Sequence, residues 1–230
     1  LISISHFTRR RVLEEFPGLK IEVAHLGVDE ENFSPGAEAA KQPFFLFVGA
    51  SKPRKGLLVA LEAFREFVRA HPGFEFRIAG VANQADGYNE KVRAFICRHE
   101  LPVVFLGALS HEALVEQFQS CTAHVLPSIS EPFYFEGFGL VHLEANLCGS
   151  LTIGTEGSAN EEIIAEGTSG FLVPQNNPAA LADAMRAAVP KIAREAERVQ
   201  QQCVEHARKF SWENSVQSIR QAYQMLTPGG

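Results

Sequence analysis

Cysteine is scarce in this sequence, and the few cysteines present are far apart. The 230-residue chain has four, at positions 97, 121, 148 and 203, and no C-x-x-C pattern occurs. Zinc knuckles and the disulfide frameworks of small secreted proteins both depend on closely or regularly spaced cysteines. The spacing therefore argues against both classes, and a reduced, cytosolic setting is the default expectation.

Long apolar runs and a signal peptide are missing as well. No apolar stretch approaches the roughly 20 residues that a transmembrane helix needs, and the first residues lack the regions of a signal peptide. The chain begins at Leu1 rather than at a methionine, which suggests a fragment of a longer protein. With 46% hydrophobic residues, the chain can form the core of one large globular domain or somewhat more.

The chain has fewer basic residues than acidic ones. The chain has 27 acidic and 21 basic residues, a formal net charge of -6, whereas proteins that bind nucleic acids present a basic face. We therefore expect no nucleic-acid partner. Basic residues cluster only at 9–11 and 52–55. The first cluster is expected to be a solvated helix face, with peripheral contact to a membrane surface or a partner as the alternative.

Several catalytic signatures are also absent. No G-x-G-x-x-G follows a predicted strand, which argues against a nicotinamide or flavin enzyme, and no G-x-S-x-G of a hydrolase occurs. No D-x-D pair is present. His124 and His142 lack the short-range partners of a metal site, so we expect them to be packing histidines with satisfied hydrogen bonds.

The sequence does contain a regular alternation of short apolar runs and helix-length segments. Runs of this length, apolar on both faces, indicate a parallel sheet covered on both sides by helices. With right-handed crossovers this predicts a Rossmann-like, doubly wound α/β fold, with its ligand crevice beyond the carboxyl ends of the strands. The predicted strands are 44–48, 74–79, 103–106, 123–126, 151–153 and 171–173, and the helices between them are 57–70, 88–100, 111–120, 138–148 and 159–165.

Helices are also predicted at both ends of the chain. Ser5 or Thr8 is suited to cap a helix that runs to about residue 16. Beyond residue 174 the pattern predicts helices at 178–188, 192–209 and 211–226. Pro190 is expected to separate the first two, and Ser211 to cap the last.

The most informative segment is 136–149, EGFGLVHLEANLCG. Its apolar residues fall at helical spacing, and its glycines stand where that helix would begin. A helix start preceded by glycines leaves backbone N–H groups free, and these suit an anion such as a phosphate. Glu136 precedes the helix and Glu144 lies about two turns further on. Sugar hydroxyls are the neutral groups that these two carboxylates could bind beside a phosphate.

This segment, preceded by LPS at 126–128, resembles the signature of retaining GT-B glycosyltransferases of the group 1 type (family 4), which use nucleotide-sugar donors. The resemblance implies that Glu136 binds hydroxyls of the donor sugar and that Glu144 binds the ribose. It also implies that amides near Phe138, Gly139 and Leu140 hold phosphate or sugar oxygens. By the same resemblance, residues 1–43 are a hinge and linker, 44–210 the donor-binding domain, and 211–230 a helix that crosses back to an N-terminal domain.

A basic loop bounded by glycines, GASKPRKG at 49–56, follows the first predicted strand of the large domain. Such a loop combines amide donors with fixed cations, which stabilise a diphosphate as negative charge builds on it. The resemblance gives Lys55 the role of contacting the donor phosphates. The family often has an arginine after the residue equivalent to Gly49, but here the residue is Ala50. Either Arg54 or Lys52 therefore supplies the second charge, or the phosphates are stabilised less than is usual in the family.

The resemblance also covers Ala108 and Leu109, whose backbone would lie against the nucleobase. It implies transfer of a sugar from a nucleotide diphosphate donor to an acceptor hydroxyl with retention of configuration, with no separate cofactor and no obligatory metal. The acceptor, a saccharide, lipid or polyol, would be bound largely by an N-terminal domain that this chain lacks. Two alternatives remain: a non-catalytic nucleotide-sugar-binding or assembly module, and a sugar-nucleotide epimerase or phosphorylase of the same fold.

Overall fold

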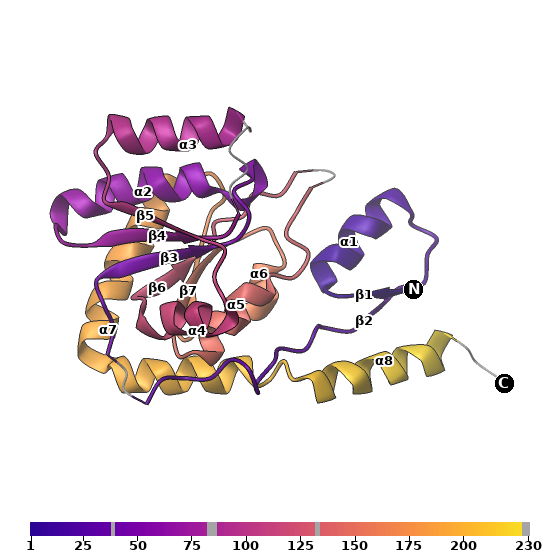
Figure 1. Cartoon of the computed structure of the whole chain (residues 1–230). Helices are drawn as coiled ribbons and strands as arrows, with labels where there is room; N and C mark the ends of the chain where they lie inside the picture. Colours follow the sequence, from indigo (N-terminus) through magenta and orange to yellow (C-terminus); the bar gives the residue numbers. More distant parts are fainter. Residues whose placement is uncertain (38–39, 82–86, 132–133, 227–230) are drawn as a thin grey trace.

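A six-stranded parallel sheet forms the centre of the molecule (Figure 1). The computed structural model describes residues 1–37, 40–81, 87–131 and 134–226. The strand order across the sheet is β5-β4-β3-β6-β7-β8. The strands are β3 (Phe44–Val48), β4 (Glu75–Ala79), β5 (Val103–Gly107), β6 (Ala123–Val125), β7 (Leu151–Thr155) and β8 (Gly170–Val173). The order reverses between β3 and β6, and doubly wound sheets bind their ligands at such a point.

Helices cover both faces of this sheet, as the apolar runs predicted. On β3, Phe45 and Phe47 face one buried cluster, and Phe44 and Leu46 face the other. The first cluster lies under α2 (Leu57–Ala70), α3 (Gly87–Arg98) and most of α7 (Pro178–Ala207). The second lies under α4 (His111–Ser120), α5 (Leu140–Leu147) and α6 (Asn160–Ile163). The doubly wound α/β fold expected from the sequence is confirmed.

A smaller unit lies beside the carboxyl ends of the strands (Figure 1). It consists of β1 (Ile2–Ser3), α1 (His6–Glu15) and β2 (Glu22–Val23), with β1 and β2 paired in parallel. Ser5 caps α1, as predicted, and its hydroxyl also donates a 2.7 Å hydrogen bond to the carbonyl oxygen of Gly137. The final helix, α8 (Trp212–Leu226), runs along the same side of the molecule, and Ser211 accepts from the N–H of Asn214 as its expected cap.

One predicted helix boundary is wrong. Pro190 does not separate the two predicted helices, because the backbone of α7 stays helical on both sides of it. The break comes five residues later at Glu195, whose backbone angles (φ -141°, ψ 31°) are not helical. A proline removes one backbone hydrogen bond but still allows the helix to continue when packing compensates. Here Ala188 and Ile192, on either side of the proline, are both buried in the core.

The start of α7 offers a test of its contribution to stability. The side chain of Asn177 accepts a 3.0 Å hydrogen bond from the N–H of Ala180, one of the free donors of the first turn. We expect the Asn177→Ala variant to lose about 1 kcal/mol of unfolding free energy, the usual effect of removing a helix cap. Urea denaturation measures the loss, and Gln201→Ala on the exposed face of the same helix is the control.

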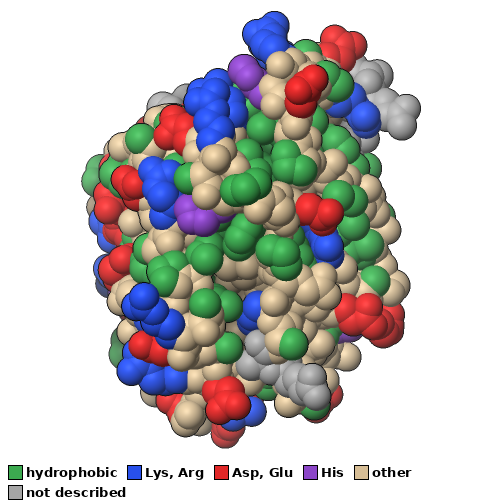
Figure 2. All heavy atoms as spheres, turned by 90° about the vertical axis from the view of Figure 1, so that its left-hand side faces the viewer, with side chains coloured by type: hydrophobic (Ala, Val, Ile, Leu, Met, Phe, Trp, Pro, Cys, Tyr) green, Lys and Arg blue, Asp and Glu red, His purple; other side chains and the backbone are tan. Residues whose placement is uncertain are grey.

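Figure 2 shows the side of the molecule away from α1, where lysine, arginine and acidic side chains are interspersed with apolar ones. No large area of one sign is visible on this face. Within the part of the chain that the structure describes, no helix is both long and apolar enough to cross a membrane.

Candidate functional site

The loop between β3 and α2 is fixed in shape by two glycine contacts. Gly56 has a left-handed backbone (φ 70°), and a Cβ atom there would lie 1.9 Å from the carbonyl oxygen of Pro127. Only glycine therefore allows the short 3-10 turn Pro53–Lys55 to pass under the loop that follows β6. At the other end of the loop, a Cβ atom on Gly80 would lie 2.1 Å from the carbonyl oxygen of Gly49. Gly49 itself ends β3 at the switch point of the sheet.

These contacts bring Lys55 against Glu136. The ammonium of Lys55 forms a short ion pair with the carboxylate, and both side chains are largely buried, with exposed fractions of 15% and 13%. Arg54 lies 3.8 Å from the same carboxylate oxygen, and the Ser128 hydroxyl 3.4 Å from it. The backbones of the two loops are also joined, because the N–H of Ile129 donates a 2.7 Å hydrogen bond to the carbonyl oxygen of Arg54.

Helix α5 starts beside these side chains with an uncapped N-terminus. Its cap residue Gly139 is left-handed (φ 89°), and no described side chain caps the first turn. The amides of Leu140 and Val141 have no partner within the helix and remain able to donate to a ligand, whereas the N–H of His142 donates a 2.9 Å hydrogen bond to the carbonyl oxygen of Gly139. Phe138 can contribute only its backbone, because its ring is buried against His25 and Phe210.

Glu144 lies further along α5, about 6 Å along the helix axis from Leu140 by helix geometry. Its carboxylate is partly buried, and no hydrogen bond to it is found among the described residues. Burial raises the pKa of this carboxyl group, opposed by the nearby His111. A partly buried carboxylate without a hydrogen-bond donor can accept a hydrogen bond from a hydroxyl group of a ligand.

Ala108 and Leu109 follow β5, two strands away from β3. Ala108 is exposed, whereas Leu109 packs on the buried cluster that Leu140 also contacts. No described contact joins either residue to Lys55 or Glu136. The turn is nevertheless at the same carboxyl edge of the sheet, because the carbonyl oxygen of Gly107 accepts a 2.8 Å hydrogen bond from the N–H of Gly80.

Two buried histidines lie below the site, and the expectation for them was half wrong. The rings of His124 and His142 are 5.1 Å apart, and both Nδ1 atoms hydrogen-bond the hydroxyl of Thr152. Their Nε2 atoms are buried without a partner among the described residues. The hydroxyl has one proton, so it donates to one ring and accepts from the other, and the two rings carry opposite tautomers. Burial lowers both pKa values, that of His142 to about 3, with smaller contributions from Lys55 and, for His124, from His142.

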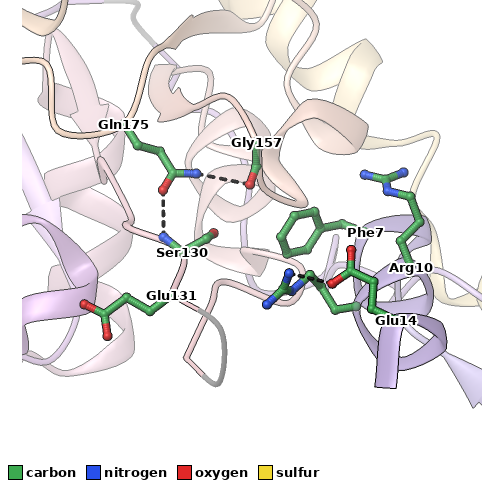
Figure 3. Close-up of a pocket in the computed structure, with 8 residues that line it drawn as sticks. Phe7, Arg10, Glu14, Ser130, Glu131, Gly157 and Gln175 are labelled. Atoms are coloured by element: carbon green, nitrogen blue, oxygen red, sulfur yellow. Dashed lines mark hydrogen bonds and ion pairs between the residues drawn. The ribbon is translucent and has the colours of Figure 1, made fainter. Parts of the chain in front are cut away.

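A pocket of about 350 Å³ separates α1 from the loops after β6, β7 and β8. Figure 3 shows Phe7, Arg10 and Glu14 on the α1 side and Ser130 and Gln175 on the other. The amide of Gln175 accepts a 2.7 Å hydrogen bond from the N–H of Ser130 and donates one of 3.1 Å to the carbonyl oxygen of Gly157. The loops at the carboxyl edge are thus held together, and the pocket extends the site toward α1.

Neither Ser128 nor the bond between the Arg54 and Ile129 backbones was predicted from the sequence. Serine is common in loops, so its presence there is not informative, and a backbone hydrogen bond does not depend on residue type. One feature of the sequence did indicate that Lys55 and Glu136 lie close together: each follows a strand, and a doubly wound topology places those two strands side by side.

The chain is a doubly wound α/β domain with two cations, one carboxylate and an uncapped helix start at the carboxyl edge of its sheet, the edge at which domains of this class hold their ligands. Residues 28–210 match the family model for glycosyl transferases group 1. The chain is a member of this family.

Relatives of known name agree with this membership. Over 221 residues the chain is 31% identical to a D-inositol 3-phosphate glycosyltransferase of Acidothermus cellulolyticus, covering 89% of this chain and 48% of the relative. A protein of the same name from Corynebacterium jeikeium is 31% identical over 232 residues, covering 91% and 53%. The chain therefore spans about half the length of these relatives.

Solved structures show the same fold. A glycosyltransferase from Rickettsia africae superimposes with a TM-score of 0.86 at 20% identity, covering all of this chain and 64% of the other. HepE from Anabaena, solved in complex with UDP and glucose, gives a TM-score of 0.81 at 19% identity, covering 97% of this chain and 62% of the other. At these identities the likeness establishes the GT-B fold and nothing more specific.

Proposed function

We propose that this chain binds the nucleotide-sugar donor of a glycosyl transfer reaction, and that the longer protein transfers the sugar to an acceptor hydroxyl with retention of configuration. The contact between Lys55 and Glu136 carries the proposal. It places a cation from the loop after β3 and a carboxylate from the loop after β6 at one point of the carboxyl edge. A nucleotide-sugar donor needs both groups. Its diphosphate requires a cation, and the sugar joined to that diphosphate has hydroxyls that a carboxylate can bind.

The arrangement suggests how the groups divide between the two parts of the donor. Lys55 and Arg54 face the same carboxylate oxygen, so an arriving diphosphate can take over both cations while Glu136 turns to sugar hydroxyls. The amides at the start of α5 add further donors. As the bond to the sugar breaks, these fixed charges stabilise the negative charge on the leaving diphosphate without a metal. Glu136 positions the sugar and forms no covalent bond to it.

The comparisons support a donor of this kind. The relatives are named as glycosyltransferases, and HepE was solved with UDP and glucose. The acceptor is assigned to the part of the relatives that this chain does not cover. The nucleobase is expected near Ala108 and Leu109, which lie at the same carboxyl edge as Lys55, and the ribose near Glu144, about one turn along the helix that starts at this edge.

Titration with UDP, GDP, ADP and their sugar conjugates, followed by thermal unfolding, tests the proposal. A ligand present at 100 times its dissociation constant adds about 2.7 kcal/mol to the unfolding free energy. One of these nucleotides is expected to stabilise the chain in this way. If none of them shifts the unfolding transition at millimolar concentration, the proposed donor site is wrong.

Glu144 can be tested separately from the phosphate site. The Glu144→Gln variant keeps the shape of the side chain but replaces one acceptor oxygen with a donor. We expect its affinity for the preferred nucleoside diphosphate to fall about tenfold, the equivalent of one lost hydrogen bond to a charged group. Its affinity for inorganic pyrophosphate should stay unchanged, because pyrophosphate has no ribose. Equal losses for both ligands would contradict the assignment of Glu144 to the ribose.

A second candidate is a nucleotide-sugar-binding module without catalysis, because the contact between Lys55 and Glu136 would serve binding equally well. Incubating the longer protein with the nucleotide sugar that binds best, and analysing the products, separates the candidates, because this chain alone is expected to bind the donor with little or no turnover. Released nucleoside diphosphate supports a transferase, tight binding without turnover supports the module, and an altered sugar on intact nucleotide would indicate an epimerase.

A further inference from the structure

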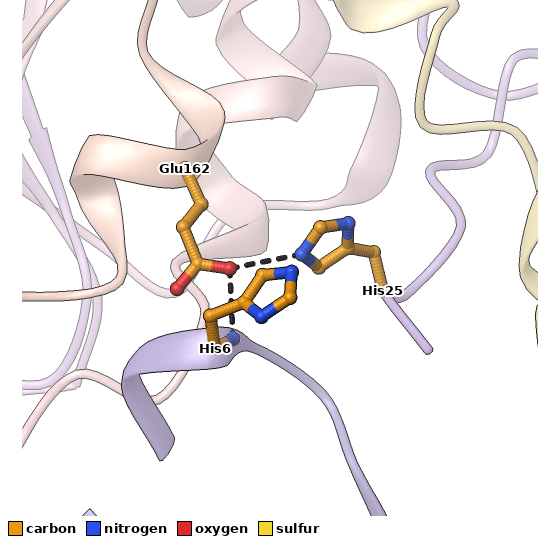
Figure 4. A group of neighbouring side chains, drawn as sticks. All are labelled: His6, His25 and Glu162. Carbon is orange, nitrogen blue, oxygen red and sulfur yellow. Dashed lines mark hydrogen bonds and ion pairs between the residues drawn. The ribbon is translucent and has the colours of Figure 1, made fainter. Parts of the chain in front are cut away.

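A cluster of two imidazoles and one carboxylate lies away from the donor site, where the small N-terminal unit meets the large domain. His6 is the first residue of α1, His25 follows β2, and Glu162 lies on α6. Figure 4 shows the carboxylate of Glu162 facing the imidazole of His25, with the imidazole of His6 beside them. One potential ligand atom from each of the three residues lies within 4.8 Å of the others. None of the three residues takes part in the proposed donor binding.

We propose that His6, His25 and Glu162 bind a divalent transition-metal ion of the zinc type. Two neutral imidazole nitrogens and one carboxylate oxygen form a ligand set that suits Zn²⁺ and leaves a fourth position for water. The Nε2 atom of His25 is 2.9 Å from Oε2 of Glu162, and a proton holds the two atoms together. A metal ion replaces that proton and binds both atoms after a small increase in their separation.

The carboxylate is already oriented for this role. Oε1 of Glu162 accepts a 2.7 Å hydrogen bond from the N–H of Phe7, and Oε2 accepts one of 2.8 Å from the N–H of His6. Such partners fix the direction of a carboxylate ligand, and the side chain of Glu162 is only 14% exposed. His25 is held as well, because its ring packs at 5.7 Å from the ring of Phe138 and at 5.8 Å from that of Phe210.

His6 supplies the adjustable ligand. It is exposed, its ring touches that of His25 at 5.7 Å, and no hydrogen bond of its side chain is found among the described residues. Ligand atoms around a tetrahedral zinc ion are about 3.3 Å apart when each bond is close to 2.0 Å. Rotation of the free His6 side chain can close the remaining distance without disturbing the fold.

A metal ion here joins segments that are far apart in the sequence. Residues 6, 25 and 162 come from α1, from the chain after β2 and from α6, so the ion ties the N-terminal unit to the large domain. The ring of Phe138, which packs on His25, stands directly before Gly139 at the start of α5. The ion is therefore structural in position and lies behind the donor loop.

Metal analysis and Co²⁺ spectroscopy test this site on the whole chain. After removal of bound metal with a chelator, we expect one Zn²⁺ to bind per chain and to raise the melting temperature. Bound Co²⁺ should show the visible absorption of a four- or five-coordinate site, with no thiolate charge-transfer band. The absence of that band excludes the four free cysteines as ligands.

His6→Ala is the decisive variant, because it removes a ligand without removing a described hydrogen bond of the fold. Its zinc affinity should fall at least about tenfold, and His25→Ala should lose zinc binding as well. His99→Ala, on the far side of the sheet, is the matched control and should bind like the parent chain. Absence of stoichiometric zinc binding, or binding unaffected by His6→Ala, would overturn the proposal and leave Glu162 as a helix cap and ion-pair partner only.

Discussion

We expect the Lys55→Ala variant to bind the preferred nucleoside diphosphate about 100-fold more weakly than the parent chain. A hydrogen bond to a charged group contributes about 1.5–3 kcal/mol, and a diphosphate oxygen would lose one from an ammonium that is only 15% exposed. Calorimetric titration at fixed ionic strength measures the loss. The chain should remain folded, because Glu136 keeps Arg54 at 3.8 Å and the hydroxyl of Ser128 at 3.4 Å.

Lys52→Ala is the matched control for this experiment. Of the two residues that could supply the second charge, Arg54 lies 3.8 Å from Glu136. Lys52, in contrast, is exposed, lies three residues from Lys55 in the same loop, and has no ion pair among the described residues. Its removal changes the net charge by the same amount as the removal of Lys55, so it accounts for any long-range electrostatic effect. If both variants lose affinity equally, the effect comes from net charge and the specific role of Lys55 is refuted.

The fold could be predicted because its signal is local. β3 has the sequence FFLFV, which is apolar at every position. In the structure its residues alternate between two buried clusters, as expected for a strand covered on both faces. The role of Gly139 at the start of α5 could also be predicted, because its left-handed backbone (φ 89°) strongly favours glycine. Pro190 was misread because the tolerance of a helix for proline depends on tertiary packing, which the sequence does not display.

The site was predictable only in part, for the same physical reason. Lys55, Glu136 and the start of α5 have residue types that match their chemistry, and each follows a strand. The sharing of the Thr152 hydroxyl by His124 and His142 depends on three segments meeting in the core. The cluster of His6, His25 and Glu162 likewise spans 156 residues of sequence. Contacts of this kind form because the fold brings distant segments together, and no short sequence motif predicts them.

The buried histidine pair makes the stability of the protein depend on pH. In the folded chain, burial lowers the pKa of His142 to about 3, and that of His124 is also well below its usual value of 6.5. The unfolded chain binds protons at both histidines as the pH falls below about 6.5, whereas the folded chain does not. The unfolded state therefore binds more protons, and the free energy of unfolding falls as the pH falls below about 6.5. For His142 the fall is about 1.4 kcal/mol per pH unit until the pH nears 3, and His124 adds to it in the same direction.

The His142→Leu variant should lose its share of this dependence. Between pH 7 and pH 5 its free energy of unfolding should fall by about 2 kcal/mol less than that of the parent chain, since one titrating group is removed over about 1.5 pH units. Urea denaturation at pH 7, 6 and 5 measures both slopes, and His99→Leu, a partly exposed histidine after α3, should keep the parent slope. The slope is the informative quantity, because the substitution also changes packing around Thr152 at every pH. Identical slopes in parent and His142→Leu chains would mean that the buried ring accepts a proton in the folded state, and the unpartnered Nε2 atoms would then need a different explanation.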